Sequence, residues 1–209
     1  MKVLVFDTET TGLPKGRNPS IYETINWPHI IQLSYIVYDS ETNELITVED
    51  DYINIADSVN IDPDSEKIHK ISREMLQDGI PIEVALDKFN RFLNKCDLLV
   101  GHNVSFDKRM IMVEGIRNKV HMIVNDTYCT MKNSIELCKI EAISKNGDKY
   151  FKYPKLSELY VELFKKEPKN THNALIDILI CMRCFCKIEL KTDISRINRT
   201  IRVMLRDTC

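Results

Sequence analysis

The sequence predicts an α/β protein in which a mixed β-sheet is flanked by α-helices. Three strand-like segments come first in the chain, and short apolar strands then alternate with segments of helical spacing. This order indicates a sheet that contains both strand directions. With 209 residues, of which 44% are hydrophobic, the chain is long enough to bury a sizeable core.

The three leading strands are short runs rich in apolar and β-branched residues. The first covers residues 2–8, and the second, residues 30–39, alternates two sets of side chains along its length. The third covers residues 44–55, and Asn43 just before it is a suitable turn residue. Between the first two strands, residues 14–28 are expected to form a polar loop.

Helical spacing takes over after Pro81, which suits the first position of a helix because no N–H partner is needed there. Apolar residues then recur every three to four positions as far as Leu93. Ser105 is expected to cap a helix that runs to Arg117. The other expected elements are strands over residues 97–101 and 122–128, and helices over residues 131–138, 157–165, 173–191 and 193–206, the last with an apolar face suited to closing the fold.

The charge balance excludes one class of protein. The chain has 29 Lys+Arg against 31 Asp+Glu, a net charge of -2, so it does not hold nucleic acid through bulk positive charge, although local phosphate contacts stay open. No repeat or flexible linker divides the sequence, and we expect a single domain over residues 1–209.

The seven cysteines and the apolar runs bear on the compartment. No run reaches the length of a signal-peptide core or a membrane span, and the scattered cysteines suit reduced thiols, so we expect a cytoplasmic protein with no membrane partner. A zinc site at Cys181, Cys184 and Cys186 would need a further ligand pair, and packing as small apolar groups is the expected role.

Asp7 and Glu9 are the first candidates for chemistry. They lie two residues apart at the end of the first strand, so their side chains point to the same face of the sheet. Two like charges this close repel each other unless a cation neutralises them or one takes up a proton. A solvated strand end would explain the pair equally well when it is considered alone.

Three further residues favour a site. Asp107 follows a short buried strand near a helix start, where it could also simply interact with the helix dipole. Asp177 lies in the apolar run of residues 174–180, where an ionised carboxylate needs a metal or an ion-pair partner. His172 precedes this helix, and because histidine titrates near neutral pH it suits a base that takes a proton from an attacking water.

The four carboxylates and the histidine form a ligand set that suits Mg²⁺ or Mn²⁺ better than zinc, because hard cations prefer oxygen ligands. Two such ions, about 3.5–4 Å apart, can stabilise the attacking and the leaving oxygens of a displacement at phosphorus. These residues therefore predict a site with two Mg²⁺ or Mn²⁺ ions for phosphoryl chemistry.

Three segments, FDTETTGLP, LVGHNVSFDKRM and HNALIDILIC, resemble the ordered motifs of the DEDDh 3′→5′ exonucleases. This DnaQ-like family includes the epsilon proofreading subunits of bacterial replicative polymerases. The motifs fall at residues 6–14, 100–110 and 172–181, and the resemblance spans most of the chain. It implies an RNase H-like fold, with a mixed sheet of three antiparallel leading strands plus parallel strands, flanked by α-helices.

The resemblance also implies roles for individual residues. Asp7, Glu9, Asp107 and Asp177 match the acidic metal-binding positions, and His172 matches the general base. Asp7 would bridge two metals, Glu9 and Asp177 would help to hold the first, and Asp107 would act partly through water. The residues that would receive the terminal nucleotide are Thr10, Thr11, Gly12, Leu13 and Phe106, with core packing an equally good account of Phe106.

Three other segments have two interpretations each. The loop of residues 14–28 interleaves basic with aromatic residues, which suits a loop that holds single strands, and packing of its single Trp on the domain is the alternative. The stretch 145–154 contains an Asn-Gly turn signal and is expected to be a solvated hairpin, with phosphate contact through its lysines as the alternative. Four arginines of the last helix, three to four residues apart, are expected to form a solvated face, with nucleic-acid or partner contact as the alternative: Arg196, Arg199, Arg202 and Arg206.

The resulting prediction is a two-metal-ion 3′→5′ exonuclease that releases nucleoside 5′-monophosphates from DNA 3′ ends in proofreading or repair. Its expected partners are a single-stranded or frayed nucleic-acid 3′ end, with DNA favoured over RNA, and a separate DNA polymerase. Two alternatives stay open: an exoribonuclease that trims RNA 3′ ends, and a polymerase-bound interaction module with secondary nuclease activity.

Overall fold

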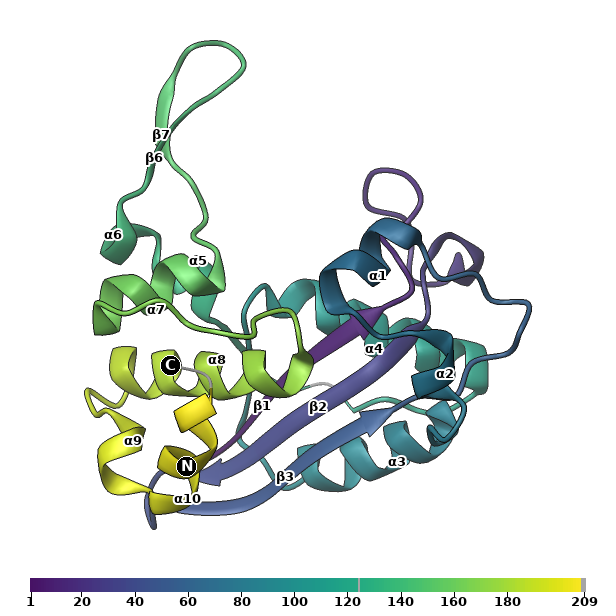
Figure 1. The fold of residues 1–209 in the computed structure, drawn as a ribbon, viewed down its shortest axis with the longest axis horizontal. Coiled ribbons are helices and arrows are strands. Elements are labelled where there is room, and N and C mark those ends of the chain that lie inside the picture. Colours follow the sequence, from purple (N-terminus) through teal and green to yellow (C-terminus); the bar gives the residue numbers. More distant parts are fainter. Residues whose placement is uncertain (124, 208–209) are drawn as a thin grey trace.

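The computed structural model describes residues 1–123 and 125–207. Within this part of the chain, the main sheet has five strands in the order β3-β2-β1-β4-β5 (Figure 1). The first three strands pair antiparallel, whereas β4 runs parallel to β1 and β5 parallel to β4. The strands are β1 (Lys2–Thr10), β2 (Ile30–Asp39), β3 (Glu44–Tyr52), β4 (Leu98–Gly101) and β5 (Thr127–Cys129). The predicted mixed sheet is confirmed.

Helices cover both faces of this sheet, which gives it two hydrophobic cores. The core on one face is built with α3 (Ile82–Leu93) and α4 (Val104–Asn118). The core on the other face is built with α8 (Ala174–Ile188), α9 (Ile194–Ile197) and α10 (Arg199–Met204). Successive residues of β1 enter alternate cores because neighbouring side chains of a strand point to opposite faces. β1 and β2 are therefore buried on both faces of the sheet.

The remaining elements are short and lie outside this sandwich. Two short helices after β3 were not predicted, because a helix of four to seven residues shows no clear apolar periodicity. Asp62 caps the first of them by accepting a hydrogen bond from the Asp64 N–H, and Pro63 is its first residue. The elements are α1 (Pro63–His69), α2 (Arg73–Leu76), α5 (Thr130–Asn133), α6 (Ile135–Cys138), α7 (Leu156–Phe164), the 3₁₀ turns Thr24–Asn26 and Leu205–Asp207, and the hairpin strands β6 (Glu141–Ile143) and β7 (Lys149–Phe151).

Two predicted element starts are wrong. The helix expected after Ser105 begins at Val104, because Asn103 adopts the left-handed conformation (φ 68°) that asparagine tolerates and turns the chain directly into α4. The strand expected over residues 122–128 is limited to β5, and Val124 lies outside the described residues.

Two predicted helices are interrupted by polar side chains that bond to nearby backbone. The helix expected over residues 131–138 is split into α5 and α6 at Ser134, whose hydroxyl donates to the Thr130 carbonyl. The closing helix expected over residues 193–206 breaks at Asn198, which is extended and accepts a bond from the Ile201 N–H as the cap of α10.

The break at Asn198 also separates the arginines expected on one helical face. Arg196 belongs to α9, whereas Arg202 belongs to α10 and donates to the backbone carbonyls of Ser195 and Arg196. The placement of the four arginines on one helical face is therefore wrong, because Arg202 helps to hold two separate short helices together. All four arginines are exposed, in agreement with the expected solvated surface.

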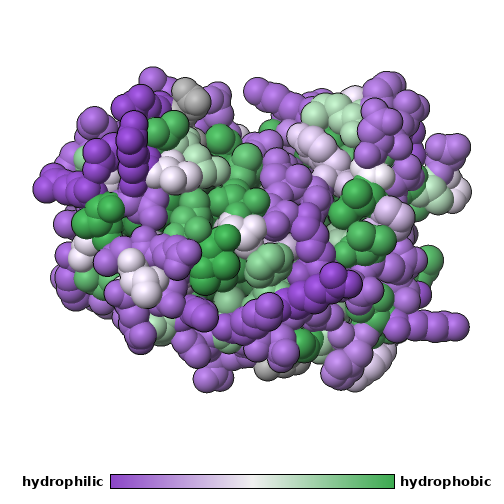
Figure 2. All heavy atoms as spheres, turned by 90° about the horizontal axis from the view of Figure 1, so that it is seen from below, coloured by the Kyte–Doolittle hydropathy of each residue, from purple (hydrophilic) through white to green (hydrophobic). Residues whose placement is uncertain are grey.

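Two further observations concern membrane-spanning helices and the distribution of apolar side chains on the surface. None of the helices in residues 1–123 and 125–207 combines the length and apolar character that crossing a bilayer requires. Apolar side chains gather in the middle of the face seen from below the view of Figure 1, and polar side chains surround them (Figure 2).

Candidate active site

Asp7 and Glu9 lie near the carboxyl end of β1, on the sheet face that α8 covers. The α8 side of β1 also carries Val3 and Val5, in agreement with the two-residue period of a strand. α8 brings Asp177 against them, one turn from its own start. One carboxylate oxygen from each of Asp7, Glu9 and Asp177 lies within 4.8 Å of the other two.

Asp107 approaches the same strand from the opposite face. It lies in the first turn of α4, is 3% exposed, and accepts hydrogen bonds at Oδ1 from the Thr8 hydroxyl (2.7 Å) and the Thr8 N–H (3.1 Å). Thr8 lies between Asp7 and Glu9 in the sequence. The hydrogen bonds from Thr8 therefore hold Asp107 close to Asp7 and Glu9. Asp107 is not part of the group of three carboxylates within 4.8 Å, and its negative charge still acts on Asp7.

The start of α8 is fixed by two hydrogen bonds, one accepted by the Asn173 side chain and one donated by the His172 N–H. The Asn173 side chain caps the helix by accepting from the Ile176 N–H. The His172 N–H donates to Asp177 Oδ2 (3.1 Å), and His172 itself is exposed with a left-handed backbone (φ 68°). The histidine and the aspartate that the sequence paired are therefore linked through the backbone, with the imidazole on the exposed side.

The electrostatics of these carboxyl groups favour a cation. Burial and then the charges of Asp107, Asp177 and Glu9 raise the pKa of Asp7 well above its usual value. Burial and the charges of Asp177 and Asp107 raise the pKa of Glu9 to about 8. Burial raises the pKa values of Asp107 and Asp177 to about 7, although hydrogen bonds from Thr8 and from the His172 N–H oppose the shifts. Without a positive partner, this cluster holds its charge at a cost.

One atom shows directly that a ligand fits. Asp177 Oδ1 is buried and has no hydrogen-bond partner among the described residues. A buried carboxylate oxygen without a partner is costly, and it lies beside the carboxylates of Asp7 and Glu9. Because all three residues offer only oxygen, the donor set fits a hard divalent cation such as Mg²⁺ or Mn²⁺.

Two supporting residues were missed at the sequence level. Thr8 holds Asp107, as described above. Gln32, which is completely buried in β2 opposite Glu9, accepts at Oε1 from the Ala174 N–H (3.3 Å) and donates to Asp50 (2.7 Å). Gln32 thereby ties the first turn of α8 to the sheet. The polar residues Gln32 and Ser34 within a largely apolar strand are a sequence signal that could have indicated such a role.

The residues expected to receive a terminal nucleotide follow β1 directly. Thr10 and Thr11 are buried and structural: the Thr10 hydroxyl donates to the Gly12 carbonyl, and Thr11 Oγ1 accepts from the His29 N–H. Leu13 is 79% exposed. It lines a depression of about 400 Å³ together with half-buried Phe106, so the structure brings these two apolar side chains together.

The loop of residues 14–28 is packed on the domain through its tryptophan. Trp27 is 5% exposed, and its indole N–H donates to the Ser20 carbonyl (3.0 Å). It is therefore not available for stacking on a base, and this part of the substrate-loop interpretation is wrong. Tyr22, Lys15 and Arg17 are exposed on the same loop.

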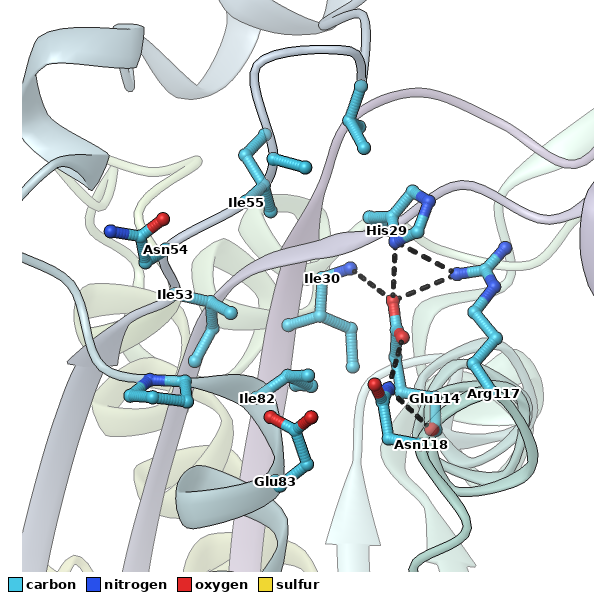
Figure 3. A pocket seen from close by; sticks show the side chains of 13 residues that line it. His29, Ile30, Ile53, Asn54, Ile55, Ile82, Glu83, Glu114, Arg117 and Asn118 are labelled. Atoms are coloured by element: carbon cyan, nitrogen blue, oxygen red, sulfur yellow. Dashed lines mark hydrogen bonds and ion pairs between the residues drawn. The ribbon is translucent and has the colours of Figure 1, made fainter.

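An ion pair between buried Glu114 and half-buried Arg117 anchors the end of this loop (Figure 3). Arg117 near the end of α4 donates to the backbone carbonyls of Thr24, Trp27 and Pro28. Glu114, one turn earlier and 2% exposed, accepts from Arg117 (2.9 Å) and from the Ile30 N–H (3.1 Å). Glu114, Arg117 and Ile30 line a pocket of about 370 Å³. The ion pair holds the chain where it re-enters the sheet as β2.

Replacement of Glu114 by alanine is expected to lower the free energy of unfolding by about 3–5 kcal/mol, because it leaves the half-buried Arg117 charge without its carboxylate and the buried Ile30 N–H without its acceptor. Urea denaturation followed by circular dichroism measures the change. Glu162→Ala is the matched control, since Glu162 pairs with Lys165 on the surface, where such pairs contribute about 0–1 kcal/mol. Equal losses in the two variants would contradict the anchoring role.

The cysteines singled out in the sequence are structural, and so is His102. Cys181, Cys184 and Cys186 are buried in α8, and burial raises the pKa of each thiol, in agreement with apolar packing. His102 follows β4 and is bound at Nδ1 to the Thr130 hydroxyl and at Nε2 to the Pro154 carbonyl, both at 3.0 Å. Burial lowers the pKa of His102 to about 4, so it is a neutral support at the end of the strand.

Comparison with known proteins agrees with this geometry. Over 138 residues the chain is 28% identical to the DNA polymerase III subunit epsilon of Pasteurella multocida (strain Pm70), which corresponds to 65% of this chain and 50% of that protein. The chain thus spans about half the length of this curated relative.

Two solved structures share the fold. Exonuclease X in complex with 5′ overhanging duplex DNA has a TM-score of 0.57 and 21% identity, with 91% of this chain and 95% of that chain covered. E. coli Exonuclease I in complex with a dA16 oligonucleotide has a TM-score of 0.63 and 18% identity, with 98% and 45% covered. The sequence profile of the family described as RNase_T: Exonuclease matches residues 4–185, and the chain therefore belongs to this DnaQ-like exonuclease family.

Proposed function

We propose that the protein is a metal-dependent 3′→5′ exonuclease that releases nucleoside 5′-monophosphates from DNA 3′ ends. The observation that carries the proposal is the group of three carboxylates at β1 and α8, with a buried Asp177 oxygen that lacks a partner. Membership of the exonuclease family supports the reaction type. The motifs at residues 6–14, 100–110 and 172–181 would belong to one exonuclease domain assigned to residues 1–209, of which 208–209 lie outside the described residues.

Asp7, Glu9 and Asp177 would hold the cation, and Asp107 would add its charge from the α4 side. When bound, one or two Mg²⁺ or Mn²⁺ ions would supply the positive charge that stabilises the attacked phosphate and the leaving 3′-oxygen. His172 would take a proton from the attacking water. Its exposed position beside the half-buried carboxylates supports this role, because a base must reach both the site and the solvent.

The edge that follows β1 would hold the 3′-terminal nucleotide. Thr10 and Thr11 fix the backbone at this edge, where Gly12 is buried beside the Asp62 side chain. Gly12 would take part through its backbone alone. Leu13 and Phe106, which line one depression, would pack against the terminal base. The proposed substrate residues therefore divide into a rigid backbone support and an apolar contact surface.

DNA is the proposed substrate because the epsilon relative is a DNA polymerase subunit and two of the structural relatives are bound to DNA. A role in proofreading or repair, with a separate DNA polymerase as partner, follows from the same likeness. RNA 3′-end trimming uses the same set of carboxylates and is the competing outcome of the test.

The test compares 5′-labelled single-stranded DNA, a duplex with a mismatched 3′ end, and RNA of the same sequence, each with Mg²⁺ or Mn²⁺. We expect stepwise shortening of the DNA from its 3′ end, release of nucleoside 5′-monophosphates, and no cleavage with EDTA. Cleavage restricted to RNA would replace the substrate assignment. Shortening from the 5′ end would contradict the proposed polarity.

A further inference from the structure

The segment between α6 and α7 exposes aromatic and basic side chains to solvent. It forms the two-stranded hairpin β6–β7, which extends away from the helices on the same side of the molecule as the loop that follows β1 (Figure 1). All three residues of β7 are exposed. The turn lies at Asn146 and Gly147, and from Pro154 to the turn the chain spans on the order of 20 Å if extended. The hairpin thus projects a considerable part of its surface into solvent.

The aromatic side chains of this hairpin have no structural role in a core. In the part of the chain that the structure describes, four aromatic residues are exposed, and three of them belong to this segment: Tyr150 (51%), Phe151 (40%) and Tyr153 (53%). An isolated two-stranded hairpin is only marginally stable in water. A group of exposed apolar side chains often marks a surface that binds another molecule. Tyr150 pairs across the hairpin with Ala142, which is too small to cover its ring.

The charge of the segment limits what that partner is. Residues 139–155 contain five lysines against two acids, Glu141 and Asp148, which gives a net charge of +3 in a chain whose net charge is -2. Lys145 and Lys149 lie on the exposed outer half of the hairpin. Exposed aromatic rings combined with positive charge are the chemistry that holds single-stranded nucleic acid, whose bases stack and whose phosphates attract lysine.

The foot of the hairpin is fixed next to the candidate active site. The carbonyl of Pro154, which follows β7, is bound to His102 Nε2 at 3.0 Å. His102 follows β4 and precedes the helix that carries Asp107. Thr130 bonds to both His102 and the Gly101 carbonyl, so the support is rigid. The arm therefore starts at the same edge of the sheet where the carboxylates lie.

We propose that the β6–β7 hairpin is a binding arm for the single-stranded part of the nucleic acid behind the 3′ end held in the active site. This inference rests on the proposed function. Tyr150 and Tyr153 stack on bases upstream of the terminal nucleotide, and Lys145 and Lys149 contact the backbone phosphates. The arm contributes affinity for long strands and takes no part in hydrolysis.

The test uses the whole protein with two double variants, Tyr150→Ala/Tyr153→Ala and Lys145→Ala/Lys149→Ala. Lys95→Ala and Val84→Ala are the controls: both residues are exposed, and Lys95 lies just before β4, at the opposite edge of the sheet. Each protein is assayed on a fluorescent thymidine 20-mer and on a thymidine dinucleotide, which is too short to reach the arm. Binding of the 20-mer is followed separately by fluorescence anisotropy in EDTA, with salt varied.

We expect the aromatic double variant to raise KM and Kd for the 20-mer roughly 30-fold or more, since each of the two lost base stacks contributes about 1–3 kcal/mol. The lysine variant should lower the slope of log Kd against log salt by about 1.4, since each phosphate contact on a single strand contributes about 0.7. Hydrolysis of the dinucleotide should stay unchanged in both variants, and the controls should match the parent protein on every substrate.

Unchanged binding of the 20-mer by both double variants would overturn the inference and leave the surface to a protein partner. An equal loss of dinucleotide hydrolysis would also overturn it, because the arm would then act on the active site. If the parent protein hydrolyses neither substrate, the proposed function fails, and the anisotropy measurement still decides whether the hairpin binds the strand.

Discussion

Replacing Asp7 by asparagine is expected to lower kcat for nucleotide release at least about 10³-fold, since a metal site supplies several kcal/mol of transition-state stabilisation. Asp7 is the carboxylate whose pKa is raised by all three of its acidic neighbours, so it lies at the centre of the cluster. Asparagine keeps the shape of the side chain and removes the charge that binds the cation. Initial rates on 5′-labelled single-stranded DNA measure the loss.

A second variant separates loss of the cation from loss of the base. His172→Ala should lower kcat by about 10²–10⁴-fold, the usual contribution of a general base. It should still be stabilised by Mn²⁺ in a thermal melt, because His172 is not one of the three carboxylates that lie within 4.8 Å of one another. Asp7→Asn should lose that stabilisation. Near-normal turnover in Asp7→Asn would contradict the assignment of the metal site.

Much of the sheet could be predicted because its signals are local. β1 and β2 are nine and ten residues long and rich in apolar side chains, and the two-residue period of a strand places Asp7 and Glu9 on one face without any tertiary information. The meeting of β1 with α8 was inferred from a resemblance, because no local pattern states which helix packs on which strand. Asp177 is 170 residues from Asp7 in the sequence.

The supports of the site could not be predicted because they depend on contacts between distant segments. Thr8 and Asp107 are 99 residues apart, and Gln32 and Ala174 are 142 residues apart. The break at Asn198 was missed for the opposite reason. Its neighbours keep an apolar helical spacing, but a side-chain cap at this position competes successfully with continuation of the helix. Apolar periodicity predicts which face is buried and does not locate such interruptions.

The stability of the metal-free protein is expected to fall as the pH rises from about 5 to about 8, which is the reverse of the usual behaviour of paired carboxylates. In the unfolded chain the acidic groups titrate near pH 4. In the folded chain the pKa of Glu9 is about 8 and those of Asp107 and Asp177 are about 7. Between about pH 4 and about pH 8 the folded state binds more protons than the unfolded state, so each step up in pH favours unfolding.

A divalent cation should reverse this loss, because it binds the folded state alone. At a concentration of 100 times its Kd, the gain is about 2.7 kcal/mol, or roughly 5–10 °C in Tm for a chain of this size. Melts at several pH values with EDTA, Mg²⁺ or Mn²⁺ measure both effects. Asp177→Asn removes one of the charges that repel Asp7, so this variant should melt higher than the parent protein in EDTA at pH 8 and gain less from the cation. A Tm in EDTA that rises steadily to pH 8 would show that the carboxylates are already neutralised within the protein, and that the cluster needs no cation.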